Sequence, residues 1–100
     1  MLFTLDSAIP EILTFSRMFA PVLSPNEDIV TGTAHGGLGA YLVHNNLISV
    51  NNGVTEFKGM QGETLGRSGT VIVNIEKNTS RIIAKIKGTA TIIFKTEIEL

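Results

Sequence analysis

The residues best suited to chemistry lie in the stretch NEDIVTGTAHGG, at positions 26 to 37. Thr31, Gly32 and Thr33 are expected in the first turn of a helix, where unpaired backbone N–H groups and the positive end of the helix dipole favour an anion. Asp28 lies just before this turn, close enough to stay ionised in the same field or, if buried, to shuttle a proton. The stretch therefore predicts a site for a carboxylate or phosphate. Asp and Thr are also ordinary N-cap residues, and that structural role is the alternative.

A second polar stretch, MQGETLGR at positions 60 to 67, places Gln61, Glu63 and Arg67 between glycines. The guanidinium of Arg67 could hold an anionic ligand, with Gln61 as a further substrate-binding side chain. The same composition is typical of a solvated hairpin loop. Spacing alone does not separate the two interpretations.

The glycines near the helix start do not form a nucleotide-binding loop. Gly32 and Gly37 have the spacing of a phosphate-binding loop, but Leu38 stands where that loop requires lysine. Gly37 and Gly39 lack the third glycine of the dinucleotide fingerprint. Close packing of the helix against strands is the better interpretation of these glycines.

Metal and thiol chemistry are not indicated by the sequence. His35 and His44 lie nine positions apart, and neither has a partner at the i, i+4 spacing of a helical zinc pair. Both are interpreted as structural histidines. The chain has no cysteine, which excludes disulfides, thiolate metal sites and a thiol nucleophile.

The elements that must position these residues follow from periodicity. From residue 31 onward apolar residues recur at helical spacing, and the polar sequence HNN at 44 to 46 ends the pattern, which predicts one helix from about Thr31 to Asn45. A turn is expected at Asn52-Gly53 and another in VLSPNED, positions 22 to 28. Alternating patterns predict strands over residues 1–6, 13–21, around Phe57, 71–75, 82–86 and 90–98. The predicted class is α+β, a mainly antiparallel sheet with one glycine-rich helix.

Composition limits the classes of function. A chain of 100 residues is expected to form a single domain, residues 1–100. With 43% hydrophobic residues, 17% charged residues and a net charge of -1, there is no electrostatic reason to expect nucleic acid or an anionic membrane as partner. No apolar stretch reaches the roughly 20 residues of a membrane span, and no secretion signal is recognisable. We therefore expect a soluble, cytoplasmic protein.

Several blocks of the sequence, taken in order, resemble a known family. The blocks are SRMFAP, NEDIVTGTAH, GAYLV, MQGETLGR and IKGTATII. Together they resemble the C-terminal half of the phenazine-biosynthesis-type isomerases (PhzF-like proteins), which are relatives of diaminopimelate epimerase and proline racemase. The resemblance covers essentially the whole chain.

The resemblance implies a fold of two similar domains, each a barrel-like sheet around one central helix, with the active site between the two helix N-termini. It implies that Asp28 and Thr33 are catalytic, and that a substrate carboxylate rests on the amides around Thr31 and Gly32. Family members move a proton along a substrate carbon frame without a metal or an organic cofactor. Because thiol-using relatives carry a cysteine that this chain lacks, the carboxylate branch of the superfamily is the one it resembles.

The resemblance also implies that the C-terminal half of the family does not contain every catalytic residue. The proton-moving glutamate of the family and its Gly-His-Pro segment belong to the N-terminal domain, which is not expected in this chain. Two functions remain open: an isomerase or epimerase half-domain that supplies one wall of the site, or a catalytically inactive truncated or split family member that self-associates. In either case we expect a homodimer, because each half of the family covers apolar surface on the other.

Overall fold

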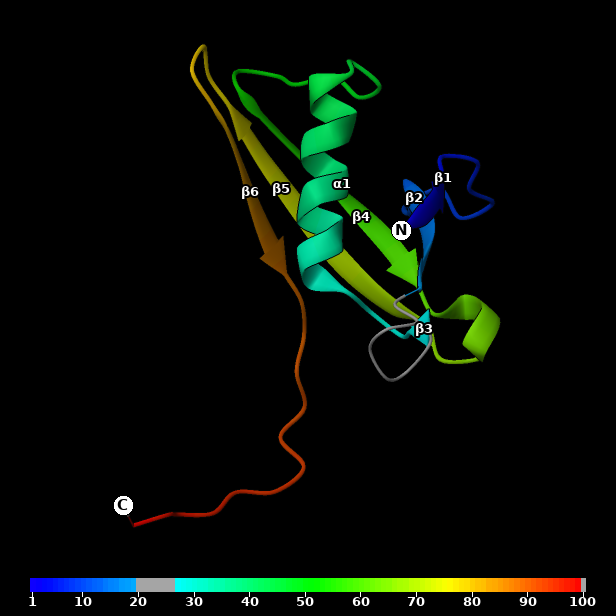
Figure 1. Ribbon diagram of the computed structural model, residues 1–100, viewed down its shortest axis with the longest axis vertical. Coiled ribbons are helices and arrows are strands. Elements are labelled where there is room, and N and C mark those ends of the chain that lie inside the picture. Colours follow the sequence, from blue (N-terminus) through cyan, green and yellow to red (C-terminus); the bar gives the residue numbers. More distant parts are fainter. Residues whose placement is uncertain (20–26, 100) are drawn as a thin grey trace.

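The computed structural model describes residues 1–19 and 27–99, in which one α-helix packs against a sheet of six strands (Figure 1). The helix α1 spans Gly32–His44, and a short 3-10 helix, η1, spans Glu63–Leu65. No helix among these residues has the length and apolar character needed to cross a membrane. The strands are β1 (Leu2–Thr4), β2 (Thr14–Phe19), β3 (Glu27–Asp28), β4 (Val54–Gln61), β5 (Gly69–Lys77) and β6 (Ile82–Lys87).

The sheet is mixed rather than wholly antiparallel. Its strands follow the order β1-β2-β4-β5-β6, and β3 pairs with the end of β2. Neighbouring strands are antiparallel except β2 and β4, which run parallel. The prediction of a mainly antiparallel sheet is therefore confirmed, and this pair is the exception because the chain between β2 and β4 contains α1. A helical crossover of this kind brings the chain back to the end of the sheet where it started, so the next strand runs parallel.

The predicted turn at Asn52-Gly53 is confirmed. Both residues have positive φ, 53° and 77°, and Asn51 forms a β-bridge with Val54 across them. Positive φ at both central positions is the geometry of a type I′ turn, for which Asn-Gly is the preferred pair. The turn leads the chain directly into β4.

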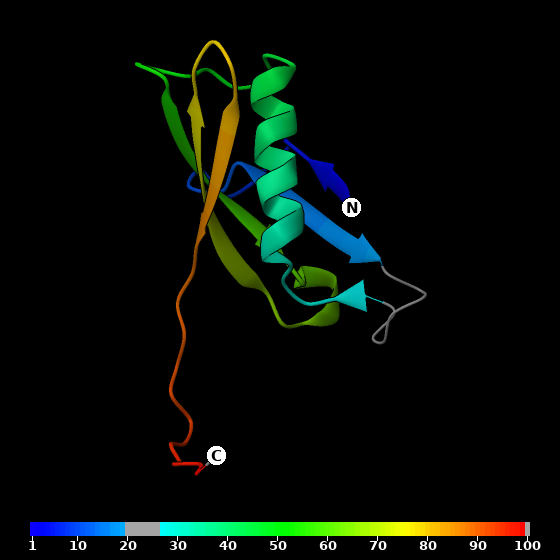
Figure 2. The same ribbon diagram turned by 60° about the vertical axis from the view of Figure 1, so that its left-hand side comes forward.

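Helix α1 lies on one face of the sheet and approaches it closely through small residues (Figure 2). A Cβ atom at Gly39 would lie 2.6 Å from Cγ1 of Val73 and 2.8 Å from Cδ1 of Ile75. On β4, a Cβ atom at Gly59 would lie 2.8 Å from Cδ2 of His35 in α1. These two glycines therefore set the distance between α1 and the sheet, as the interpretation of close packing expects.

The apolar core fills the space between α1 and the central strands. Period-2 alternation directs every second residue of β4 and β5 toward the helix, while the intervening residues face away. The buried side chains come from α1 (Leu38, Leu42, Val43), β4 (Phe57) and β5 (Val71, Val73, Ile75).

The strand predicted over residues 90–98 is absent. The chain leaves the sheet after β6, and residues 88–99 form no strand (Figures 1 and 2). A strand needs a neighbour to accept and donate its backbone hydrogen bonds, and within the described residues no strand lies beyond β6. The sheet consequently stays open instead of forming the barrel-like wall around the helix that was expected.

The other predicted elements agree with the structure in position, although their lengths differ: β4, β5 and β6 are longer than predicted, and the helix and the first strands are shorter. The helix expected from Thr31 to Asn45 spans Gly32–His44, with those two predicted end residues as its caps. The strand expected over 1–6 is Leu2–Thr4, and the strand expected over 13–21 includes Thr14–Phe19. Residues 20–26, which contain the end of that predicted strand and most of the predicted VLSPNED turn, lie outside the described residues.

We expect Gly39→Ala to lower the free energy of unfolding by about 1 kcal/mol or more. The added methyl would overlap Val73 and Ile75, which are both fully buried, and overpacking of this kind costs about 1–3 kcal/mol. Gly37→Ala is the matched control, because no atom lies within 4 Å of its Cβ position. There the gain in helix propensity should raise stability by about 0.5–1 kcal/mol. Urea unfolding measures the free energy of unfolding of both variants. An equal increase for Gly39→Ala and Gly37→Ala would contradict the close approach of Gly39 to β5.

Candidate functional site

The short strand β3 holds the predicted site residue Asp28 beside the sheet. Met18 of β2 lies opposite Asp28, and Phe19 lies opposite Glu27. The carboxylate of Glu27 accepts two hydrogen bonds from Arg17, from Nε over 2.9 Å and from Nη2 over 3.0 Å. This bidentate geometry fixes β3 to β2. Because successive strand residues point to opposite faces, Asp28 is directed the other way, toward the start of α1.

The ion pair also affects how its two members ionise. Hydrogen bonds from the Arg17 guanidinium lower the pKa of Glu27 below its ordinary value of 4.5, and Glu27 in turn raises the pKa of Arg17. The hydroxyl of Thr64 donates to the same carboxylate over 3.3 Å. A single charged contact thus joins β2, β3 and η1.

Asp28 and Thr31 form a hydrogen-bonded pair directly before α1. Oγ1 of Thr31 donates to Oδ2 of Asp28 over 2.6 Å. Thr31 is the N-cap residue, with an extended backbone (φ -124°, ψ 101°), but its side chain makes no capping bond to the helix. The hydroxyl therefore holds the Asp28 carboxylate in place, and the capping role that the sequence left open for Thr31 is not the one its side chain plays.

Gln61, at the end of β4, makes hydrogen bonds to the same loop. Its side chain is 1% exposed. Nε2 donates to the carbonyl oxygen of Asp28 over 2.9 Å and to Oγ1 of Thr31 over 3.1 Å. Oε1 accepts the backbone N–H of Thr31 over 3.3 Å. The amide group is therefore occupied by the loop, so Gln61 sets the positions of Asp28 and Thr31.

His35 connects this loop to the second strand. Nδ1 of His35 lies 2.8 Å from the carbonyl oxygen of Thr31, and because a carbonyl only accepts, Nδ1 carries the proton. Nε2 lies 3.2 Å from Oγ of Ser16 on β2. The ring is 0% exposed. His35 thus has the structural role that the sequence suggested, whereas its contact with Ser16, 19 residues earlier, had no sequence signal.

The first turn of α1 is partly exposed and has no side-chain cap. The structure shows no side-chain cap and no acidic residue in that turn. Gly32 is partly buried beside Ile86, and Thr33 is exposed. Uncapped amides at the positive end of the helix dipole favour an anion, and Gly32 carries no side chain that would block its approach.

The structure brings most of the predicted site residues together and leaves one apart. Asp28, Thr31 and Gln61 share hydrogen bonds, and Gly32 and Thr33 follow directly in α1. The remaining residue, Arg67, is exposed in the connection between β4 and β5. No hydrogen bond or ion pair among the described residues joins its side chain to the Asp28 loop. The role of Arg67 in holding an anionic ligand stays a prediction.

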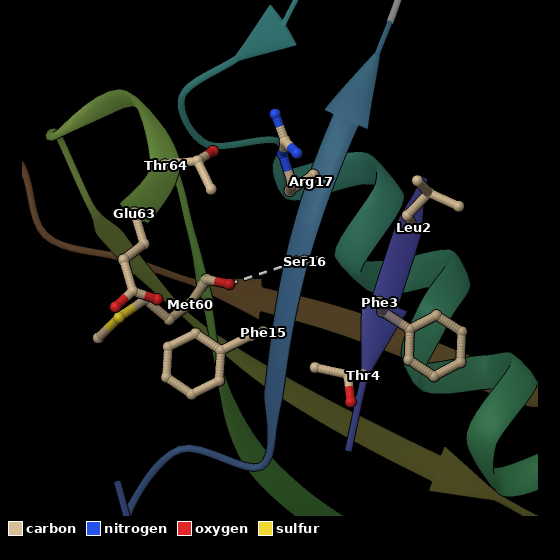
Figure 3. A pocket seen from close by; sticks show the side chains of 9 residues that line it. All are labelled: Leu2, Phe3, Thr4, Phe15, Ser16, Arg17, Met60, Glu63 and Thr64. Carbon is tan, nitrogen blue, oxygen red and sulfur yellow. Dashed lines mark hydrogen bonds between the residues drawn. The ribbon is translucent and has the colours of Figure 1, made fainter. Parts of the chain in front are cut away.

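A separate groove of about 240 Å³ lies between β1, β2, β4 and η1 (Figure 3). Phe15 and Met60 line it, together with the charged residues Arg17 and Glu63. None of the residues that the sequence predicted for the site lines this groove. This groove and the Asp28 loop are thus different features, although residues that line the groove bond toward the loop. Ser16 contacts His35. Arg17 and Thr64 bond to Glu27, the neighbour of Asp28 in β3.

Metal-ligating side chains do not gather in the described part of the chain. No group of three or more His, Cys, Asp or Glu residues there could hold a metal ion. The arrangement around Asp28 offers a carboxylate, a hydroxyl and backbone N–H groups. These groups suit binding of an anion and transfer of a proton.

Known proteins resemble this chain over nearly its whole length. Residues 2–96 match the family described as phenazine biosynthesis-like protein. An uncharacterized isomerase from Clostridium acetobutylicum is 43% identical over 99 residues, which are 98% of this chain and 33% of that relative. The uncharacterized isomerase YddE from Escherichia coli strain K12 is 44% identical over 86 residues, which are 84% of this chain and 29% of that relative. The chain therefore spans about a third of the length of the curated relatives it matches.

We expect Gln61→Leu to lower the free energy of unfolding by about 2–3 kcal/mol. The change removes three hydrogen bonds and leaves the N–H of Thr31 and the carbonyl of Asp28 without their buried partner. Arg67→Gln is the control, because Arg67 is exposed and such changes stay within about 0.5 kcal/mol. Urea unfolding compares them. A loss below about 0.5 kcal/mol for Gln61→Leu would show that the loop does not depend on this amide.

We expect Arg17→Gln to raise the pKa of Glu27 toward its ordinary value of 4.5. The lowered pKa means that the unfolded chain binds this proton more tightly than the folded chain. The stabilisation is therefore present above pH 4.5 and is lost as the pH falls through the lower folded pKa, and Arg17→Gln should reduce this acid sensitivity. NMR titration of the Glu27 side chain measures the shift. Lys87→Gln is the control, because Lys87 lowers the pKa of Glu56 instead.

Proposed function

The chain belongs to the phenazine biosynthesis-like protein family, and from that premise we propose that the start of α1 forms one wall of a site that shifts a proton within a small carboxylate-bearing substrate. The named relatives are isomerases, which supports a rearrangement as the type of reaction. One observation in the structure carries the proposal. The Asp28 carboxylate is held by Thr31 over 2.6 Å beside a helix start with no side-chain cap.

The substrate carboxylate binds at the open helix start in this proposal. The amides of Gly32 and Thr33 donate to it, and the helix dipole adds to the attraction. Gly32 allows the close approach, and the exposed hydroxyl of Thr33 supplies a further hydrogen bond. A bound acid would then lie directly beside Asp28.

Asp28 exchanges the proton on this side of the substrate. Its carboxylate accepts a proton from one substrate atom or returns one to another, so that the substrate is rearranged with no net change in protons. Thr31 and Gln61 act as positioning residues in this proposal, because their hydrogen bonds hold Asp28 in place. The step as proposed uses only these protein groups and the substrate.

A second proton-transferring group completes the reaction from the opposite side. Glu27, the neighbouring carboxylate, does not provide it, because Arg17 and Thr64 hold it on the other face of β3. In the proposal that group comes from a second wall, which corresponds to the part of the relatives that this chain does not match.

We expect small carboxylates to bind at the start of α1. Titration with anthranilate should move the amide signals of Gly32, Thr33 and Ala34, whereas the uncharged anthranilamide should not. Asp28→Asn should bind anthranilate at least as tightly, because it removes a negative charge close to the anion. Unmoved amide signals at these three residues would refute the binding half of the proposal.

Proton transfer is tested by reconstitution. The part of the Clostridium acetobutylicum relative outside the matched region is expressed separately and mixed with this chain in D2O. Deuterium incorporation into small carboxylic acids should appear only in the mixture and should fall by at least about tenfold with Asp28→Asn, a loss of about 1.4 kcal/mol in transition-state stabilisation. Incorporation that is unaffected by Asp28→Asn would remove Asp28 from the reaction. Carboxylate binding without incorporation in the mixture would instead favour a non-catalytic binding role.

A further inference from the structure

His35 is a buried polar side chain for which the proposed reaction gives no role. It is 0% exposed, and both of its ring nitrogens have partners within the chain. Nδ1 lies 2.8 Å from the carbonyl oxygen of Thr31, and Nε2 lies 3.2 Å from Oγ of Ser16. A polar group is stable at such depth only when it is hydrogen-bonded, so these two contacts determine where the ring lies. The Nδ1 partner belongs to the loop that carries Asp28.

The ring is packed against the backbone of β4 and has one favoured orientation. A Cβ atom at Gly59 would lie 2.8 Å from Cδ2 and 2.9 Å from Nε2 of His35. The ring therefore occupies the space that a side chain at Gly59 would need. The Ser16 hydroxyl, on the other strand that the ring contacts, also lies 3.4 Å from the carbonyl oxygen of Met60 (Figure 3). A ring turned over in this space would lose both of its hydrogen bonds.

The carbonyl oxygen of Thr31 receives two hydrogen bonds from His35. The backbone N–H of His35 donates over 3.3 Å, which is the ordinary helical bond to the residue four positions earlier. The ring donates from Nδ1 over 2.8 Å and makes the shorter contact. Because the ring is buried, its hydrogen bond lies in surroundings of low dielectric, where such a bond is stronger than in water.

This carbonyl and the N–H of Gly32 belong to the same peptide group. A peptide is planar and its C=O and N–H point in opposite directions, so a bond that fixes the carbonyl also fixes the direction of the N–H. A hydrogen bond at the carbonyl polarises the group and strengthens its N–H as a donor. The ring of His35 thus acts on the Gly32 N–H through one peptide, without lying beside the ligand.

We propose that His35 is a positioning residue of the site, whose Nδ1–H orients and polarises the Thr31–Gly32 peptide so that the Gly32 N–H donates to the substrate carboxylate. This proposal rests on the proposed function, which assigns the carboxylate to that N–H. The ring forms and breaks no covalent bond, and its proton stays on Nδ1. Thr31 also donates to Asp28 over 2.6 Å, so the anion-binding amide and the proton-transferring carboxylate share one anchored residue.

Two variants of equal size separate this role from a merely structural one. Asn and Leu have side chains of nearly the same shape, and both are shorter than His, so His35→Asn and His35→Leu lose the ring and its contact with Ser16 alike. Only Asn retains an N–H donor for the Thr31 carbonyl. Asn45 shows that this side chain spans the distance, because its Nδ2 donates over 2.9 Å to the carbonyl of Tyr41, four residues earlier. A purely structural histidine would make the two variants equivalent.

NMR titration with anthranilate compares the unmodified chain with both variants. His35→Asn should bind within about twofold of the unmodified dissociation constant, whereas His35→Leu should bind at least about threefold more weakly. Without anthranilate, the Gly32 amide nitrogen signal should stay near its unmodified position in His35→Asn. It should move upfield in His35→Leu, because the peptide is less polarised. Equal dissociation constants for the two variants would overturn the proposal.

A measurement on the unmodified chain does not depend on how the variants fold. The 15N signals of the His35 ring should show the proton on Nδ1, and a coupling through the hydrogen bond should connect Nδ1 to the carbonyl carbon of Thr31. A proton on Nε2 without that coupling would overturn the proposal. If anthranilate leaves the Gly32 signal of the unmodified chain unmoved, the proposed function fails and this proposal fails with it. Binding of equal strength in all three chains would overturn the role of His35 alone.

Discussion

The closeness of α1 to the sheet is the constraint on which the rest of this structure depends. There is no room for a side chain at Gly39 on the helix or at Gly59 on β4, so the helix packs closely against the sheet at both positions. This approach buries Leu42, Val73 and Ile75 almost completely. It also places His35 where its ring reaches both the loop before the helix and β2. A larger residue at either glycine would push α1 away from the sheet. This would disturb the apolar core and the polar contacts of His35 at the same time.

The start of α1 is open because its usual capping groups bond elsewhere. The Thr31 hydroxyl donates to Asp28, and its backbone N–H is bonded to Gln61. Buried polar groups of this kind are stable only when they are hydrogen-bonded, and the Gln61 amide meets that condition for the loop. The result is a carboxylate held by hydrogen bonds beside a helix start that has no side-chain cap. Rigid placement of this kind is what electrostatic catalysis and proton transfer require.

The two ends of the sheet differ in how they are completed. At one end, β3, η1 and the Arg17–Glu27 ion pair fix the loop that carries Asp28. At the other end, no strand within the described residues pairs with the outer edge of β6, and the segment that follows β6 exposes large apolar side chains. The region around Asp28 is therefore the part of the sheet that is held by contacts within the described chain.

Local patterns were enough to predict the helix, the Asn52-Gly53 turn and most strands. Each of these depends on periodicity or on the φ preference of a few adjacent residues, which the sequence states directly. Motif order also identified the family. The sequence did not reveal the bonds of Gln61 to Thr31 or of Ser16 to His35, because these pairs are 30 and 19 residues apart. It also predicted a strand over 90–98 that the chain does not form. Sequence alone determined which segments favour a strand or a helix, and the tertiary structure decided which of them find partners, because backbone and side-chain hydrogen bonds need a second group that only folding brings near.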